Sequence, residues 1–473
     1  MVPPSHAAAP LLSRRAMLKE AGGGFGAVAL AALLAGETRA AGVAPSLGKP
    51  HFAPRAVRVL YLFMHGGPSH VDLFDPKPDL AKLAGKPLPD SFGMVMTRRK
   101  VAANPLLPPL LPLRPRGESG LVVSDFLPEM AKCADDLCVV RSCHADSVNH
   151  PQAVYQMSTG SILMGKPSLG SWISYGLGSE NQDMPAFIVM PDPGGGLKGG
   201  PPAWGNGFLP AAHQGTPVRP GANPILHLRP PADVSDERRT RMLDFVARRN
   251  REHLAQREGD DELAARIKSY ELAARMQSAA PELVDLASET AETEQLYGLD
   301  DPETREFGTR CLLARRMLER GVRFVQLYSG DTVGWDAHED VLKNHSKLCR
   351  ATDRPIAALL QDLKRRGLWD DTLIVWGGEF GRMPMSEKGK GRDHNPWGFT
   401  TVLAGGAVRG GIAYGATDAV GLRAEENKVH VHDLHATILH ILGFDHTRLT
   451  YSHSGREQRL TDVHGNVVHE LLA

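Results

Sequence analysis

Histidine and carboxylate residues gather in four short segments of the sequence, each rich in glycine or other turn-forming residues. The segments span 65–75, 142–150, 329–338 and 378–395, and they contain His65, Asp72, His150, Asp336, His338, Glu379, Asp393 and His394. Imidazole nitrogens and carboxylate oxygens are the common ligands of zinc and of harder divalent ions, and catalytic sites draw them from several loops. We therefore expect a site for a divalent metal, whether zinc, calcium or magnesium. The alternative for each histidine is a hydrogen-bonded residue that fixes a turn.

Short apolar runs precede these segments and predict the strands that position them. Residues 57–64 form a near-continuous apolar run that ends at His65-Gly66-Gly67-Pro68, which is typical of a strand buried on both faces. Similar runs lie at 137–140, 186–190, 322–327 and 372–376. In parallel sheets, functional groups gather beyond the carboxyl ends of the strands. The sequence thus predicts an α/β fold with a mostly parallel central sheet flanked by helices.

Helical spacing dominates residues 234–320, which are rich in Ala, Leu, Glu and Arg. This segment predicts a helical insertion, either a cap or a crossover. Further helices are expected at 359–368 and 434–442. Residues 41–473 exceed the size at which single cores stop growing, so we expect one large domain that carries this insertion.

The first 40 residues have the pattern of an export signal. Arg14 and Arg15 lie within Ser-Arg-Arg-Ala-Met-Leu-Lys, followed by a glycine-rich apolar stretch at 21–34 and small residues near 38–40. This pattern predicts a twin-arginine signal peptide and a periplasmic or secreted protein. The apolar stretch is shorter than the roughly 18 residues of a spanning helix, so we expect no stable membrane span after cleavage. The alternative is a retained N-terminal anchor.

The amino-acid composition bears on possible binding partners and on the state of the cysteines. Lys+Arg and Asp+Glu balance at 54 each and no long charged run occurs, which argues against nucleic acid as a partner. Cys133, Cys138 and Cys143 recur every five residues, whereas Cys311 and Cys349 stand apart. Thiolate metal sites normally use closer pairs. We expect packed thiols or one disulfide.

Four motifs together resemble a known family. Leu-Phe-Met-His-Gly-Gly-Pro-Ser-His-Val-Asp at 62–72, Gly-Trp-Asp-Ala-His at 334–338, Trp-Gly-Gly-Glu-Phe-Gly-Arg at 376–382 and Gly-Arg-Asp-His-Asn-Pro at 391–396 look like the exported sulfatase-like proteins of domain-of-unknown-function family 1501. The resemblance runs from about residue 57 to the C-terminus. It implies the alkaline phosphatase and sulfatase superfamily, whose members share a mostly parallel sheet flanked by helices and often hydrolyse phosphate or sulfate esters with bound metal.

The resemblance assigns provisional roles to the clustered residues. His65 stands where the superfamily's first strand ends in a metal-binding Asp, and Asp72 follows it. Asp336 and His338 are similar to a ligand pair, while Glu379 keeps one ligand of a late Asp-His pair whose second position is Phe here. Asp393-His394 resembles the following histidine site.

The superfamily's nucleophile is the largest departure. The Thr159-Gly160 step points back to Asn149-His150 where sulfatases carry Cys or Ser, and no Cys-x-Pro-x-Arg motif exists. We therefore expect metal-activated water as the nucleophile, with His150 as a catalytic residue and with Arg382 or Arg392 holding the anion. The alternative for these arginines is a solvated loop charge. The expected substrate is a small-molecule or polysaccharide ester of sulfate or phosphate. The rival hypothesis is a non-catalytic exported binding or assembly protein that keeps the fold.

Overall fold

A nine-stranded sheet forms the centre of the protein in a computed structural model that describes residues 49–95, 97–219, 235–257 and 261–473. The expected signal peptide lies outside these residues. The strands run in the order β12-β4-β11-β8-β1-β7-β5-β6, with β15 beside β4. Their bounds are β1 Arg58–Met64, β4 Leu137–His144, β5 Phe187–Met190, β6 Thr216–Pro217, β7 Phe324–Ser329, β8 Thr372–Gly377, β11 Phe399–Ala404, β12 Ile412–Tyr414 and β15 Val429–His430.

The sheet is mostly parallel, as predicted. β1 pairs in parallel with β7 and β8, and β5 pairs in parallel with β6 and β7. Only β11 among these nine strands runs against the rest, because it pairs antiparallel with both β4 and β8. The five apolar runs seen in the sequence correspond to β1, β4, β5, β7 and β8. The predicted α/β class is therefore confirmed.

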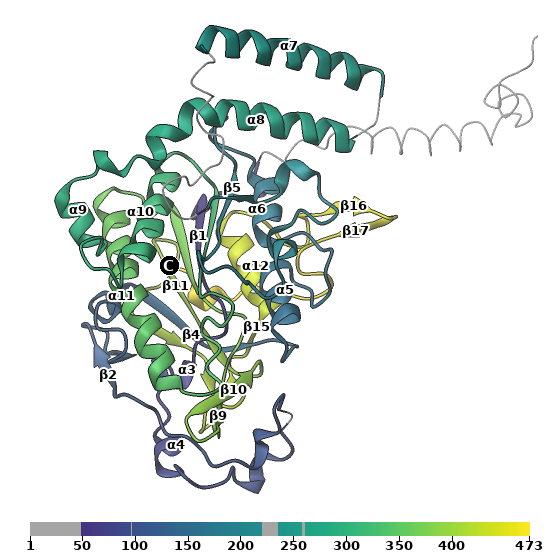
Figure 1. The fold of residues 1–473 in the computed structure, drawn as a ribbon. Coiled ribbons are helices and arrows are strands. Elements are labelled where there is room, and N and C mark those ends of the chain that lie inside the picture. Colours follow the sequence, from purple (N-terminus) through teal and green to yellow (C-terminus); the bar gives the residue numbers. More distant parts are fainter. Residues whose placement is uncertain (1–48, 96, 220–234, 258–260) are drawn as a thin grey trace, which may run out of the picture.

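Helices cover both faces of the sheet, and the alternation of side chains in β1 explains why (Figure 1). Leu60, Leu62 and Met64 join the core under α10 (Arg305–Glu319) and α11 (Val341–Arg365). The intervening side chains of β1 join the core under α5 (His150–Thr159), α6 (Leu169–Leu177) and α12 (Val431–Ile441). Successive strand residues point to opposite faces, so a strand between two helical layers must be apolar throughout.

Residues 235–320 are mainly helical but do not form one unit. α10 packs on β7 within the main core, whereas α7 (Asp236–Ala255) packs on α8 (Asp261–Val284) at the periphery (Figure 1). The described residues also include the short helices α3 His70–Leu73, α4 Pro78–Lys82 and α9 Ala291–Leu296. Two-stranded ladders join β2 Leu113–Arg116 to β3 Leu121–Ser124, β9 Gly381–Glu387 to β10 Gly391–Asn395, β13 Ala416–Thr417 to β14 Ala424–Glu426, and β16 Tyr451–His453 to β17 Arg456–Gln458.

Two expectations from composition can be compared with this structure. All five cysteines are buried free thiols, so the packed-thiol alternative applies and the disulfide does not. Within the described ranges, none of the helices has the length and apolarity needed to cross a membrane.

Candidate metal centre

Two loops meet in backbone contact at the carboxyl edge of the sheet. The loop after β1 carries His65, and the loop after its neighbour β7 carries Asp336. The amide of Trp335 donates to the carbonyl of His65 at 2.9 Å. Gly66 has φ +110°, and a Cβ at this position would lie 2.5 Å from the amide nitrogen of Asp336. Only glycine permits this approach, which places His65 and Asp336 at the same sheet edge.

Asp336 is the centre of the cluster. Five nitrogen atoms surround its carboxylate: His338 Nε2 at 2.9 Å, His394 Nε2 at 3.1 Å and Arg382 Nη2 at 2.8 Å from Oδ1, and His150 Nε2 at 2.9 Å and Lys198 Nζ at 2.7 Å from Oδ2. Burial alone would raise the pKa of Asp336, but the charge of Arg382 holds it well below its usual range. Asp336 is therefore an anion around which the other groups are arranged.

Glu379 lies two residues after the end of β8 and forms the second carboxylate of the site. It is fully buried, and its oxygens accept the Gly66 amide at 3.0 and 3.1 Å. His150, the first residue of α5, places its Nδ1 atom 2.5 Å from Glu379. Burial would raise the pKa of Glu379, but chiefly the hydrogen bond from His150 lowers it to about 2. Glu379 therefore stays ionised inside the protein.

The β9–β10 hairpin supplies the opposite side of the cluster. His394 lies on β10 across from Arg382 on β9, so these two residues sit within a hairpin rather than at a strand end of the central sheet. Asp393 accepts the amides of His394 at 2.9 Å and Arg99 at 2.8 Å. Glu387 on β9 lies 2.6 Å from His338 Nδ1.

Three imidazoles around Asp336 are oriented by acceptors at Nδ1. His150 Nδ1 faces Glu379, His338 Nδ1 faces Glu387, and His394 Nδ1 faces the carbonyl of Val148 at 2.7 Å. If Nδ1 carries the proton, each neutral ring presents the Nε2 lone pair to the Asp336 carboxylate. Burial, together with the charges of Arg382 and His150, lowers the pKa of His394 to about 3, so this ring is neutral near pH 7.

His65 is also held at Nδ1, but its Nε2 atom contacts a backbone amide and not Asp336. Its Nδ1 faces the carbonyl of Asp331 at 3.1 Å, and its Nε2 accepts the amide of Lys198 at 3.2 Å. Burial lowers the pKa of His65. The Nε2 lone pair of His65 is thus occupied by the Lys198 amide, and a metal ligated by His65 would have to displace that hydrogen bond.

These contacts fit a metal ion. Three overlapping groups have ligand atoms within 4.8 Å of one another: His65, His150 and Glu379; His150, Asp336 and His394; and His338, Asp393 and His394. The Nε2 atoms of His150 and His338 are buried and make no hydrogen bond of acceptable geometry, although each lies 2.9 Å from Asp336. Lone pairs that face a carboxylate repel it, and a cation between them would relieve that repulsion.

Asp72 and Arg392 lie outside the three groups. Arg392 is fully buried, with Nε 2.9 Å from Asp72, and its remaining donors bind the carbonyls of Leu107, Pro108, Met383 and Pro384. Asp72 also accepts the Ser69 hydroxyl and the Leu110 amide. This ion pair joins the loop after β1 to the hairpin, so the geometry gives Arg392 a structural role in place of the expected anion-binding one.

Arg382 also has no donor group turned to solvent. It is fully buried and binds the carbonyls of Gly66, Gly67 and Arg392 in addition to Asp336. The solvated-loop alternative is therefore wrong for both arginines. Arg382 holds Asp336 in place and balances its charge.

Lys198 and Glu387 were missed by the sequence argument. Lys198 lies in the glycine-rich loop that follows β5, the one predicted strand whose end carries no histidine cluster, and its side chain is 28% exposed. Because functional residues gather in loops at the carboxyl ends of parallel strands, the position of Lys198 after β5 was a usable sequence signal. Nothing in the sequence marked Glu387 as a site residue, because it reaches His338 only through the fold of the β9–β10 hairpin.

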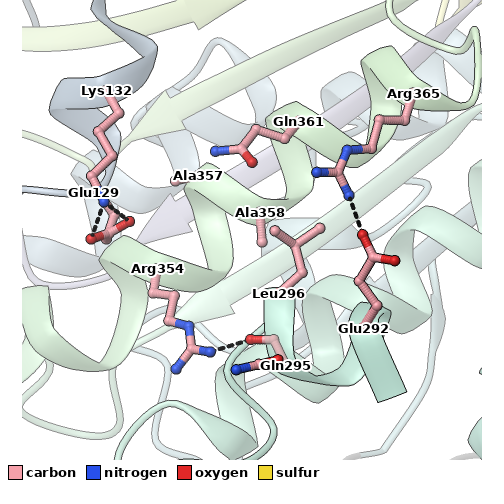
Figure 2. Close-up of a pocket in the computed structure, with 10 residues that line it drawn as sticks. All are labelled: Glu129, Lys132, Glu292, Gln295, Leu296, Arg354, Ala357, Ala358, Gln361 and Arg365. Atoms are coloured by element: carbon pink, nitrogen blue, oxygen red, sulfur yellow. Dashed lines mark hydrogen bonds and ion pairs between the residues drawn. The ribbon is translucent and has the colours of Figure 1, made fainter. Parts of the chain in front are cut away.

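A cavity of about 450 Å³ lies elsewhere, between α9, α11 and η3 (Met130–Asp136) (Figure 2). Figure 2 shows that its charges are paired: Lys132 lies 2.7 Å from Glu129, the N-cap of the same element, and Arg365 on α11 lies 3.5 Å from Glu292 on α9. Its lining contains neither histidine nor cysteine. The candidate chemistry is therefore at the sheet edge and not in this cavity.

Several solved structures resemble this chain at low identity. The lipoteichoic acid synthase LtaP from Listeria monocytogenes is 10% identical, covers 85% of this chain and 76% of its own, and has a TM-score of 0.36. The PsFucS1 sulfatase from Pseudoalteromonas sp. is 12% identical, with 82% and 68% covered and a TM-score of 0.33. A TAB5 alkaline phosphatase mutant with magnesium is 9% identical, with 84% and 99% covered and a TM-score of 0.31. Likeness at this level says nothing about activity.

Sequence comparison is more specific. No curated protein matches this sequence. The profile of the family described as "Protein of unknown function (DUF1501)" matches residues 56–472, which is most of the chain. The match includes every residue of the metal centre and agrees with the resemblance drawn from the four motifs. The chain therefore belongs to the DUF1501 family.

Proposed function

We propose that the protein is a metal-dependent hydrolase of sulfate or phosphate esters that uses metal-activated water. The observation that carries this proposal is the set of buried imidazole nitrogens that converge on Asp336 without hydrogen-bond geometry. Ligands drawn from several loops are typical of catalytic metal sites. The residues that would hold metal are His65, His150, Asp336, His338, Glu379, Asp393 and His394.

The chain's own residues set the charge and orientation of this site. A divalent ion bound there would polarise an ester oxygen and lower the pKa of a water ligand, whether the ion is zinc, calcium or magnesium. Glu387 and the Val148 carbonyl hold two imidazoles by Nδ1, which fixes the ring planes. Arg382 balances the charge of Asp336 from the buried side.

Lys198 replaces the two arginines as the group that would hold the substrate anion. Its ammonium group lies 2.7 Å from Asp336, and its side chain is 28% exposed, unlike those of the two buried arginines. Arg98 is a second exposed cation, 3.5 Å from His394 Nδ1. Cations from two separate loops suit an anionic ester, either small or part of a polysaccharide.

A second candidate function follows from burial. The side chains of the proposed ligands are at most 9% exposed. Closed sites are typical of structural metals, whereas catalytic metals keep an open position. A binding or assembly protein that retains a structural metal would have this geometry too.

One experiment separates the two candidates. Protein from residue 41 onward is purified, loaded separately with zinc, calcium and magnesium, analysed for bound metal, and tested with aryl sulfate and aryl phosphate. Bound metal with turnover, both lost in Asp336→Asn and kept in the exposed control Asp183→Asn, supports the hydrolase. Bound metal without turnover supports the structural metal. Absence of metal from the loaded protein contradicts both.

We also propose export by the twin-arginine route. This proposal rests on Arg14 and Arg15 and on the weakly apolar stretch that follows them. Lysine at both positions should retain the protein in the cytoplasm, as cell fractionation would measure. Continued export of that double variant would contradict the proposal.

A further inference from the structure

Lys198 contacts two residues of the metal centre with two different atoms. Its ammonium group lies 2.7 Å from Asp336 Oδ2, and its backbone amide donates to His65 Nε2 at 3.2 Å. Because His65 Nδ1 faces the Asp331 carbonyl, Nε2 is the atom that His65 can offer to a divalent ion. Carboxylate oxygens and neutral imidazole nitrogens are ligands of such ions. An ion held by His65 and Asp336 would therefore meet Lys198 at both ligands.

Lys198 is the partner of Asp336 that can leave at the least cost. The other cation on this carboxylate, Arg382, is fully buried and also binds three backbone carbonyls. The three imidazoles around Asp336 are at most 9% exposed, whereas the Lys198 side chain is 28% exposed. An ammonium group that reaches solvent can exchange an ion pair for water with little loss of free energy, which a buried guanidinium cannot.

The loop that carries Lys198 is held at two points with a glycine-rich segment between them. It spans residues 191–200 and contains five glycines, four of which have positive φ. Near one end, the carboxylate of Asp192 accepts the Gly330 amide at 2.9 Å. Near the other end, the Tyr155 hydroxyl donates to the Gly199 carbonyl at 2.8 Å. Residues 193–196 are exposed, and glycine backbone has access to many conformations, so this segment can change its path while both ends stay in place.

We infer that Lys198 is a reversible cover of the metal centre, which leaves Asp336 and His65 when a divalent ion binds there. An ammonium group and a divalent ion on the same carboxylate repel each other strongly at such short range, so Lys198 and the ion occupy this position in turn. The released ammonium group stays on its loop beside the centre and is then available to a substrate anion. This inference rests on the metal centre of the proposed function and adds a residue that regulates access to it.

Zinc titration tests the inference in protein from residue 41 onward. Lys198→Met keeps an unbranched side chain but removes the ammonium group, so zinc affinity should rise by about tenfold or more as the competing contact is lost. The matched control is Arg98→Met, which removes the same charge from a side chain that contacts His394 Nδ1 at 3.5 Å. This control leaves the contacts of Asp336 and His65 as they are. It should change zinc affinity by less than about threefold, because an exposed charge is screened.

Hydrogen exchange measures the movement of the loop without any assay of turnover. Zinc should speed the exchange of amides in residues 194–198 of the unchanged protein, because the Lys198 amide loses His65 as its acceptor. Residues 330–338 provide the control within the same sample. Their exchange should slow, because Asp336 and His338 become fixed by the ion.

A pair of glycine variants keeps the test decisive if Lys198→Met fails to fold. Gly196 has φ +75°, and a Cβ there would lie 2.8 Å from the Cα atom of Thr332, so Gly196→Ala disfavours the covering path of the loop. Gly195 has a similar φ of +67° with nothing within 4 Å, so Gly195→Ala is the control for backbone strain alone. Zinc affinity should be higher in Gly196→Ala than in Gly195→Ala.

The outcomes separate this inference from the proposed function. If zinc binds but Lys198→Met raises its affinity no more than Arg98→Met does, Lys198 is not a cover, while the metal centre stands. Unchanged or slower exchange of residues 194–198 with zinc bound would overturn the inference in the same way. If zinc binds neither the unchanged protein nor any variant, the metal centre of the proposed function is wrong and this inference is wrong with it.

Discussion

At the scale of single residues, the site depends on the groups that contact the Nδ1 atoms of its histidines. His338 is held by Glu387 through Nδ1 at 2.6 Å, and Glu387 is in turn 3.3 Å from Arg99. Glu387→Gln keeps the shape but removes the charge, so we expect metal affinity to fall about 10–100-fold. Isothermal titration with zinc would measure it. The control is Glu339→Gln, whose carboxylate is 80% exposed and pairs only with Lys388. Equal affinities in the two variants would contradict the role of Glu387.

Ser147 gives a second prediction at this scale. Its hydroxyl is nearly buried and contacts only the backbone of Asn149, at 3.2 and 3.5 Å, as in a local turn. We expect Ser147→Ala to keep its metal and most of any turnover, whereas Asp336→Ala and His338→Ala should lose metal. Metal content and aryl ester turnover are measured side by side. A Ser147→Ala variant that binds metal but is inactive would point to a covalent serine intermediate.

At the scale of elements, the contact between the loops after β1 and β7 builds the site. Gly66→Ala places a Cβ 2.5 Å from the Asp336 amide at φ +110°. We expect it to cost more than about 1–2 kcal/mol in unfolding free energy, the usual cost of left-handed backbone alone, and to impair metal binding. Gly85→Ala is the control, because its φ is +78° with nothing within 4 Å. Urea unfolding with metal titration would measure both effects. Similar losses of unfolding free energy and metal affinity in the two variants would show that the loops after β1 and β7 can separate at no cost.

The elements differ in how well the sequence predicts them. β1, β7 and β8 were predictable because strands buried on both faces must be continuously apolar, and parallel pairing then brings their ends together. His65, Asp336 and Glu379 followed from that rule. The β9–β10 hairpin was not predicted, because its strands carry charged residues such as Arg382 and Glu387 that are buried only through partners on other loops. The same limitation explains the wrong expectation for Arg392, since a buried ion pair and an anion-binding arginine look alike in sequence.

At the scale of the whole molecule, α11 links the metal centre to the far end of the core. It begins three residues after His338, and its later turns pack under the sheet. Asp353 on α11 accepts the amides of Glu129 and Met130 at 2.7 and 2.8 Å and is 3% exposed. Burial raises the pKa of Asp353 to about 6, against the opposing effect of these amides. A buried carboxyl thus joins η3 to the main helical layer.

This raised pKa predicts how stability depends on pH. Between about pH 4 and pH 6 the folded protein retains a proton that the unfolded chain has lost, so stability falls as pH rises through this window. The difference between the ordinary pKa and the folded value of about 6 corresponds to about 3 kcal/mol of unfolding free energy, which is fully lost above the folded pKa. Asp353→Asn removes this slope but leaves one amide without its acceptor, a cost that does not vary with pH. Urea unfolding at several pH values would measure the difference, with Asp183→Asn as the exposed control. Curves for Asp353→Asn that run parallel to those of the unchanged protein would show that the carboxyl does not titrate in this window.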